Sequence, residues 1–415
     1  MAMAPKKPYM KSTKVKRSVR LNSWRKNTQN GLMKWKACRS KKWDWVPVKP
    51  LPGAFIVNFG DAIENKADEY GSIPVPNVQY LAMNELKEIP SRYIQPKAET
   101  DRVSIDESRE IPVIDLQELL HGQGGDQMAS FHTACKDWGF FQLINHDVTE
   151  GIIEKIKGDA EEFFRLPLEK KEAYAQQPET IQGYGQAFVV SEEQKLDWRD
   201  IFSLRTFPIA ERLAKFWPTS PTSFSETIER YVEELQQLNL RLLELIAKNL
   251  GVDADKLTNT CKNGTQWFRI NYYPPCPQAD KVIGISPHSD ASLITLLIQV
   301  NEVEGLQIKK NGTWVPVKPL PGAFIVNIGD ALEMLSNGVY KSIEHRGAIN
   351  PERERLSIAV FQLPTSGILV GPFEEVLGNS GAKYKTVDYD EYMKSYFGTK
   401  LEGKRALDLV KLGEI

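Results

Sequence analysis

His288 and Asp290 stand two positions apart in a C-terminal region made of short, strand-like segments. Successive side chains of a β-strand point to opposite faces, so these two are expected to point to the same side. Turns of Gly, Pro and Asn separate the segments, which is typical of all-β barrels and double-sheet jelly rolls. The expected strands cover residues 267–273, 292–299, 305–309, 313–316, 323–328, 342–345 and 356–362.

Helical patterns lie on both sides of this region, so the sequence predicts an α+β fold: a double-stranded β-helix (jelly roll) core flanked by N-terminal and C-terminal helices. The clearest helix covers residues 225–250, where apolar residues recur at helical spacing. Ser225 suits its N-cap and Gly251 its C-terminal stop. Further helices are expected at 127–137, 151–165 and 388–397, strands at 111–115 and 139–144, and an extended, Pro-rich arm at 71–110.

A metal site is predicted where His288 and Asp290 meet His345, which ends a later strand. Two histidines and one carboxylate, with no cysteine, form the ligand set of non-haem Fe(II) oxygenases. Such a set leaves coordination positions for a chelating substrate and O2. A single His-x-Asp occurs readily by chance, so the prediction depends on the ordered set and on the polar residues downstream of His345.

Those downstream residues are Arg355-Leu-Ser357, at the start of an apolar strand. An inward-facing guanidinium needs an anionic partner, and a carboxylate can accept two parallel hydrogen bonds from it. Ser357 lies two residues further on, so its hydroxyl faces the same way. Tyr273 offers a third donor to the same carboxylate, although a role in core packing is an open alternative.

Ordered motifs recur along residues 71–415: VPNVQYLAMNEL, PSRYIQP, IPVIDL, CKDWGFFQLINHDV, QGYGQAFVVSEEQKLDW, FRINYYPPCP, HSDASLITLLIQ, LSNGVYKSIEHRG and RLSIAVF. In these stretches the chain resembles the plant 2-oxoglutarate- and Fe(II)-dependent dioxygenase superfamily, and within it the SRG1-like and codeine O-demethylase-like group. One departure is Asp147, where the family commonly has Gly. Asp adopts positive φ more readily than most residues, so only a small strain is expected there.

The resemblance implies a role for each motif residue. His288, Asp290 and His345 would bind Fe(II), and Arg355, Ser357 and Tyr273 would bind the distal carboxylate of 2-oxoglutarate. Asn271 would help to position that cosubstrate, and Phe361 would line the substrate pocket. His121, His132 and His146 are expected to be structural.

The same resemblance implies an oxidoreductase that consumes O2 and 2-oxoglutarate, with ascorbate as a reductant, and releases succinate and CO2. Its substrate would be a small specialised metabolite (phenolic, alkaloid, flavonoid or terpenoid) that is hydroxylated, demethylated or desaturated.

The N-terminal region departs from the usual family chain. Residues 1–42 contain 14 Lys or Arg and no Asp or Glu, which predicts a basic, disordered leader. Within residues 43–70, the stretch from Trp45 to Glu64 repeats the stretch from Trp314 to Glu333 with two differences over 20 positions. This partial duplicate contains no His-x-Asp, so it cannot form a second iron site. We expect it to precede an N-terminal dioxygenase domain at 71–260 and a catalytic jelly-roll domain at 261–415.

Three other functions stay open at this point: an ascorbate-consuming, ethylene-forming oxidase, a catalytically silent jelly roll, and a nucleic-acid-associated protein recruited by the leader. Outside the leader, 39 basic residues face 54 acidic ones, which disfavours nucleic-acid binding by the main body. No apolar run is long enough to span a membrane. We expect a cytoplasmic monomer with reduced cysteines, or a nuclear or plastid protein if the leader is a targeting signal.

Overall fold

The structure is a computed structural model of the 415-residue chain, and it forms two units, Met1–Ala67 and Asp68–Ile415. In the first unit it describes the backbone of residues 24–29, 32–39 and 42–47. In the second unit it describes residues 72–83, 88–95, 103–104, 110–122, 125–178, 180–186, 189, 191–379, 381–398 and 405–413.

The first unit contains a three-stranded antiparallel sheet in the order β1 (Trp24–Gln29), β2 (Leu32–Arg39) and β3 (Lys42–Pro47). These strands overlap residues 1–42, for which the disordered leader stays a prediction. The sequence signal that favours strands here is Asn30-Gly31, a pair typical of tight hairpins, between β1 and β2. Most of the duplicate, residues 48–64, lies outside the described residues.

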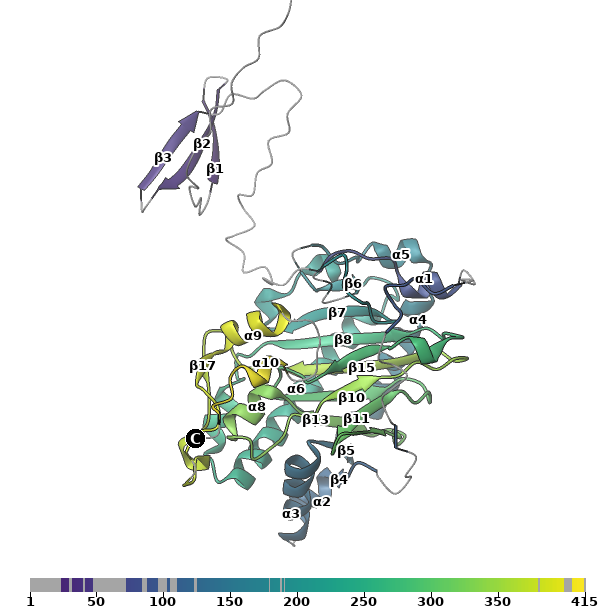
Figure 1. The fold of residues 1–415 in the computed structure, drawn as a ribbon, viewed down its shortest axis with the longest axis vertical. Coiled ribbons are helices and arrows are strands. Elements are labelled where there is room, and N and C mark those ends of the chain that lie inside the picture. Colours follow the sequence, from purple (N-terminus) through teal and green to yellow (C-terminus); the bar gives the residue numbers. More distant parts are fainter. Residues whose placement is uncertain are drawn as a thin grey trace, which may run out of the picture. The chain divides into compact units, whose positions relative to one another are not determined.

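The second unit is built on two facing sheets, which confirms the predicted jelly roll (Figure 1). The larger sheet has the order β4 (Val113–Asp115), β5 (Phe140–Ile144), β13 (Phe324–Ile328), β10 (Ile294–Gln299), β15 (Arg355–Gln362), β8 (Gln266–Tyr273), β7 (Asp200–Phe207) and β6 (Gly183–Gly185). The smaller sheet has the order β12 (Thr313–Pro316), β11 (Leu306–Lys310), β14 (His345–Gly347) and β9 (Ile285–His288). Only the β4–β5 pair is parallel among the described ladders. A separate two-stranded ladder joins β16 (Leu369–Val370) and β17 (Val387–Asp388).

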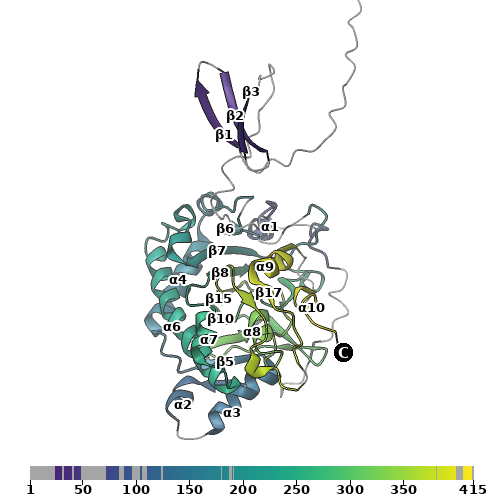
Figure 2. The same ribbon diagram turned by 90° about the vertical axis from the view of Figure 1, so that its left-hand side faces the viewer.

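Helices flank the sheets as predicted, and Figure 2 shows α4 (Glu150–Arg165) and α6 (Phe224–Leu250) side by side along the larger sheet. Both helices bury one apolar face, because Ile156, Phe163, Leu235 and Leu242 pack into the main core. The other helices are α1 (Val78–Met83), α2 (Leu116–His121), α3 (Gly125–Thr133), α5 (Leu168–Glu172), α7 (Ala254–Asn259), α8 (Asp330–Leu335), α9 (Tyr389–Gly398) and α10 (Arg405–Asp408). Single turns are η1 (Ala134–Trp138), η2 (Ile209–Glu211), η3 (Ala214–Phe216), η4 (Ala279–Lys281) and η5 (Glu374–Val376).

The N-terminal arm is anchored beside β7. The carboxylate of Asp200 accepts hydrogen bonds from the backbone N–H groups of Val78 and Gln79, at 2.8 and 2.7 Å. These are N–H groups that the first turn of a helix leaves without partners, so Asp200 stabilises the start of α1. The expected extended arm therefore contains one short helix, and its anchor lies next to Arg199.

Two local predictions were wrong, the N-cap at Ser225 and the strand at 342–345, and one was confirmed, the positive φ of Asp147. Ser225 does not cap α6: the helix begins at Phe224, and the Ser225 hydroxyl donates to the carbonyl of Pro218. The strand expected at 342–345 begins later, at His345, and is β14 (His345–Gly347). The backbone N–H of Ser342 donates to the Glu333 carboxylate, so it is not available for a strand ladder. Asp147 adopts the expected positive φ, at 63°.

Candidate active site

Strands β9 and β14 and the loop after β9 bring the three predicted metal ligands together, and Asp290 lies in that loop and not, as expected, on the same strand as His288. His288 and His345 are register partners, and their ring centroids lie 4.2 Å apart. Oδ1 of Asp290 lies 3.6 Å from Nε2 of His288 and 3.7 Å from Nε2 of His345. All three side chains are buried, with exposed fractions of 4 to 8%. One ligand atom from each residue lies within 4.8 Å of the others, so the group could hold a metal ion.

Hydrogen bonds orient each of these ligand atoms. Nδ1 of His288 lies 2.9 Å from the carbonyl oxygen of Ser286, and Nδ1 of His345 lies 3.0 Å from that of Ile343. An Nδ1–H that donates to a carbonyl leaves Nε2 as a lone-pair donor for a metal. On Asp290, Oδ2 accepts from Thr295 Oγ1 at 2.7 Å and from Asn327 Nδ2 at 2.8 Å, which leaves Oδ1 facing the histidines.

The electrostatics also suit a cation. Burial, together with the neighbouring His345, lowers the pKa of His288 to about 3, so its imidazole is neutral at physiological pH. Burial alone would raise the pKa of Asp290, but His345 and His288 hold it below its ordinary value. A neutral imidazole at His288 and an ionised carboxylate at Asp290 are the protonation states that metal binding requires of these two residues.

A second group of predicted residues lies on the inner face of the paired strands β8 and β15. In their register Arg355 lies opposite Tyr273, and Ser357 lies opposite Asn271. The guanidinium of Arg355 is centred 5.0 Å from the Tyr273 ring. The Arg355 side chain also lies against the backbone of Gly305. A Cβ at that position would lie 2.8 Å from Cδ of Arg355, so the absence of a side chain on Gly305 leaves room for the arginine. Residues predicted to bind iron, to bind the cosubstrate and to line the substrate pocket all line one cavity. They include His288 for iron, Arg355 and Ser357 for the cosubstrate, and Phe361 for the substrate.

This second group contains buried polar atoms without partners. Nη2 of Arg355 donates to Gln299 Oε1 at 2.9 Å, but Arg355 Nε and Ser357 Oγ are buried and make no hydrogen bond. Burying such groups unpaired is costly, so their presence indicates a ligand with acceptor oxygens. The distal carboxylate of 2-oxoglutarate fits that donor set.

Two buried arginines in the same cavity were not singled out from the sequence. Arg199 precedes β7, and its Nη1 donates to Asn271 Oδ1 at 2.8 Å. Arg269 lies two residues before Asn271 on β8, so strand alternation alone places both on one face. That spacing could have identified Arg269, whereas nothing in the local sequence links Arg199 to the site.

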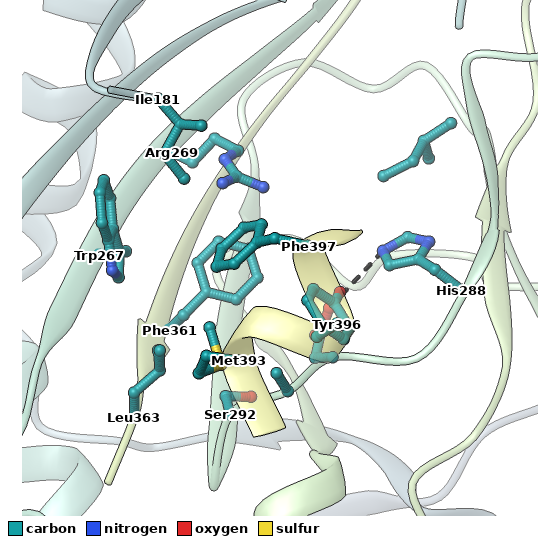
Figure 3. Close-up of a pocket in the computed structure, with 13 residues that line it drawn as sticks. Ile181, Trp267, Arg269, His288, Ser292, Phe361, Leu363, Met393, Tyr396 and Phe397 are labelled. Atoms are coloured by element: carbon teal, nitrogen blue, oxygen red, sulfur yellow. Dashed lines mark ion pairs between the residues drawn. The ribbon is translucent and has the colours of Figure 1, made fainter. Parts of the chain in front are cut away.

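Phe361 lines a second cavity that His288 and Asp290 also line. Arg269, Ile285, His288, Asp290 and Phe361 line this cavity as well as the one described above. Figure 3 shows Trp267, Phe361 and Leu363 together with Met393, Tyr396 and Phe397 from α9 around this cavity. The mostly apolar lining suits a small organic substrate.

Helix α9 is hydrogen-bonded to the loop after β9 that carries the candidate metal ligand Asp290, here called the ligand loop. The Tyr396 hydroxyl donates to the carbonyl of Ser289 at 3.0 Å, and the Tyr389 hydroxyl donates to that of Ala291 at 2.9 Å. Tyr392 donates to Asp330 Oδ2 at 2.7 Å, and the backbone N–H of Asp330 donates to the carbonyl of Asp290. The helix therefore both lines the second cavity and supports the ligand loop.

The remaining histidines lie elsewhere. Nε2 of His146 lies 2.9 Å from the carbonyl of Gly322, and Nδ1 of His132 lies 2.9 Å from the Tyr340 hydroxyl. His121 is an exposed residue at the end of α2. Within the described residues, none of the three belongs to a group that could hold a metal ion. No helix of the described part is long and apolar enough to cross a membrane.

Comparisons with known proteins give this geometry its class. The model of the 2OG-Fe(II) oxygenase superfamily matches residues 264–364, and the model of the non-haem dioxygenase in morphine synthesis N-terminal region matches residues 111–220. The chain belongs to the plant 2-oxoglutarate- and Fe(II)-dependent oxygenases, as the sequence motifs indicated.

Individual relatives agree with that class. S-norcoclaurine synthase 1 of Coptis japonica is 54% identical over 82% of this chain and 97% of its own length. Codeine O-demethylase of Papaver somniferum is 40% identical over 82% of this chain and 97% of its own length. The crystal structure of JOX2 in complex with 2OG, Fe and JA covers 82% of this chain and 98% of its own, at 37% identity and a TM-score of 0.76. The protein is thus an oxidoreductase that uses Fe(II) and 2-oxoglutarate and acts on a small specialised metabolite.

Proposed function

We propose that His288, Asp290 and His345 bind the Fe(II) of this oxygenase, and that Arg355, Ser357 and Tyr273 bind the C5 carboxylate of 2-oxoglutarate. The observation that carries the proposal is the coincidence of two independent features in one cavity. Three oriented ligand atoms face one another at one place, and two buried donors without partners lie at another.

The chain's own residues hold the reactants and exclude water. Iron bound here supplies the redox chemistry that converts O2 and 2-oxoglutarate into succinate, CO2 and an oxidised substrate. Asn271, held by Arg199, orients the cosubstrate between the two groups. Phe361 and the α9 side chains decide which C–H bond of the substrate lies nearest the iron, so they select hydroxylation, demethylation or desaturation.

For the substrate, we infer a small molecule of the phenolic, alkaloid, flavonoid or terpenoid type. The aromatic and apolar lining of the substrate cavity supports this class. So do the relatives named as a norcoclaurine synthase and a codeine O-demethylase. The cytoplasmic location and the monomeric state stay predictions.

The test is an anaerobic titration of the purified protein with Fe(II) and then with 2-oxoglutarate. The expected result is a weak visible charge-transfer band in the wild-type chain and no band in His288→Ala. Its matched control is His121→Ala, an exposed histidine outside the site, which should leave the band unchanged.

Three results would contradict the assignment. A band that persists in His288→Ala would mean that other residues bind the metal. Iron binding without a band, with turnover that depends on ascorbate alone, would favour the ethylene-forming type of oxidase. No iron binding at all would favour a silent jelly roll.

A further inference from the structure

The sequence motif that ends at Trp198 has no role in the proposed function, yet it lies among the elements that build the site. The backbone N–H of Trp198 donates to the carbonyl of Ile283, just before β9, at 2.7 Å. Its indole Nε1 donates to the carbonyl of Pro274, just after β8, at 3.2 Å. The segment is therefore held between the strand that ends at His288 and the strand that carries Asn271.

One oxygen of the neighbouring Asp197 carboxylate holds the residue that orients His288. Oδ1 of Asp197 accepts hydrogen bonds from the backbone N–H of Ser286 at 3.0 Å and from the Ser286 hydroxyl at 2.6 Å. The carbonyl oxygen of Ser286 lies 2.9 Å from Nδ1 of His288. Hydrogen bonds to an ionised carboxylate are shorter and stronger than those between neutral groups. Asp197 therefore fixes the carbonyl on which the orientation of the His288 ring depends.

The other oxygen of Asp197 faces the cosubstrate residues. Oδ2 lies 3.7 Å from Nη2 of Arg199, and Nη1 of Arg199 donates to Oδ1 of Asn271 at 2.8 Å. Arg199 is 3% exposed, and a guanidinium buried to this extent needs a nearby anion. Asp197 supplies that anion, so it holds the side chain that in turn holds Asn271.

We propose that Asp197 is a positioning residue whose single carboxylate orients both the iron ligand His288 and the cosubstrate residue Asn271. Asp197 lines neither cavity, so it acts only through Ser286 on one side and Arg199 on the other. The iron ligand and the cosubstrate residue thereby keep a fixed position relative to each other. This proposal rests on the proposed function, because it concerns the geometry of that same site.

The test uses two substitutions that separate the two oxygens of Asp197. Asp197→Ala removes both, so the Kd for Fe(II) and the Kd for 2-oxoglutarate at saturating iron should each rise about tenfold or more. Asp197→Asn keeps an acceptor for Ser286 but turns an NH2 group toward the guanidinium of Arg199. It should restore the Fe(II) Kd to within about threefold of wild type, while the 2-oxoglutarate Kd stays about tenfold higher. Competition with a chelator measures the first Kd, and the anaerobic charge-transfer titration measures the second.

The position of the charge-transfer band separates a change of geometry from a loss of stability. At saturating Fe(II) and 2-oxoglutarate, the wavelength of maximum absorption depends on how the ligands surround the iron, so it should shift in Asp197→Ala. The control is Asp159→Asn, because Asp159 is also a buried carboxylate that accepts from a serine hydroxyl, that of Ser223 at 3.0 Å. Asp159 lies on α4 and lines neither cavity, so its substitution should leave the band and both Kd values unchanged.

Three results would overturn the proposal: wild-type Kd values in Asp197→Ala, a loss of Fe(II) affinity with an unchanged 2-oxoglutarate Kd, or equal losses in Asp159→Asn. If Asp197→Ala fails to fold, Asp197→Asn and Ser286→Ala carry the test. The first should weaken mainly 2-oxoglutarate, and the second, which removes one of the two bonds to Oδ1, should weaken mainly Fe(II). The opposite pattern, or no effect in either variant, would also overturn it. Absence of the band in the wild type would instead contradict the proposed function.

Discussion

Along the inner face of β8 and β15, the register pair Tyr273 and Arg355 differs from the pair Trp267 and Phe361 in polarity and in neighbours. The first pair presents buried donors that suit one unchanging carboxylate. The second pair is aromatic and faces side chains of α9, an element that comes later in the chain than either strand. A shared strand pair can therefore keep one end fixed for a constant cosubstrate while the other end varies with the substrate.

We expect the largest effect from loss of the metal, because the reaction of the cosubstrate at one end and of the substrate at the other both depend on it. His288→Ala should lower Fe(II) affinity by more than the roughly 10- to 100-fold that loss of an outer-sphere partner costs, because one of three ligands is gone. Iron content after dialysis and succinate release would measure it. His121→Ala is the control, and retained iron in His288→Ala would contradict the ligand set.

Arg355→Lys tests the polar end alone. Lysine keeps the charge but lacks the planar fork, so the Kd for 2-oxoglutarate should rise about 10- to 100-fold. Anaerobic titration would measure it, with the exposed Arg353→Lys as a neighbouring control. An unchanged Kd would remove Arg355 from the cosubstrate site and with it the contrast between the two ends.

Thr295→Val asks how much the orientation of Asp290 matters. The substitution removes the donor to Asp290 Oδ2 at nearly constant volume. Loss of such a partner should weaken Fe(II) binding about tenfold. Competition against a chelator would measure it, and Thr313→Val on β12 is the control. Equal affinity in the two variants would mean that Asn327 alone suffices to hold the carboxylate.

Tyr396→Phe acts on the substrate end. It removes the hydrogen bond from α9 to the carbonyl of Ser289, so the free energy of unfolding should fall by about 1 kcal/mol. The Kd for 2-oxoglutarate should stay nearly unchanged, because the polar end lies on other elements. Denaturant unfolding and anaerobic titration would measure the two quantities. A large change in cosubstrate affinity would show that the ends are coupled through the ligand loop.

The same contrast explains what the sequence could and could not predict. Arg355 and Ser357 were found because alternation within a single strand determines which side chains share a face. His288 and Asp290 were found by their spacing in the sequence, although β9 ends at His288 and Asp290 lies in the loop after it. Arg199 and the α9 side chains were missed because only tertiary packing brings them to the site. The wrong N-cap at Ser225 has a similar cause: Ser223 precedes the helix in a helical conformation, and its hydroxyl bonds to Asp159 instead of to the first turn.

The smallest expected effect comes from removing the N-terminal region. A chain that starts at Gly71 keeps every residue of both cavities and the Asp200 anchor of α1. Its charge-transfer band and its Kd for 2-oxoglutarate should therefore match those of the full chain. Failure of the shorter chain to fold or to bind iron would show that the first unit supports the oxygenase. A band that appears only in the shorter chain would instead show that this unit blocks the site, and the difference between the two ends would then have to be measured again without it.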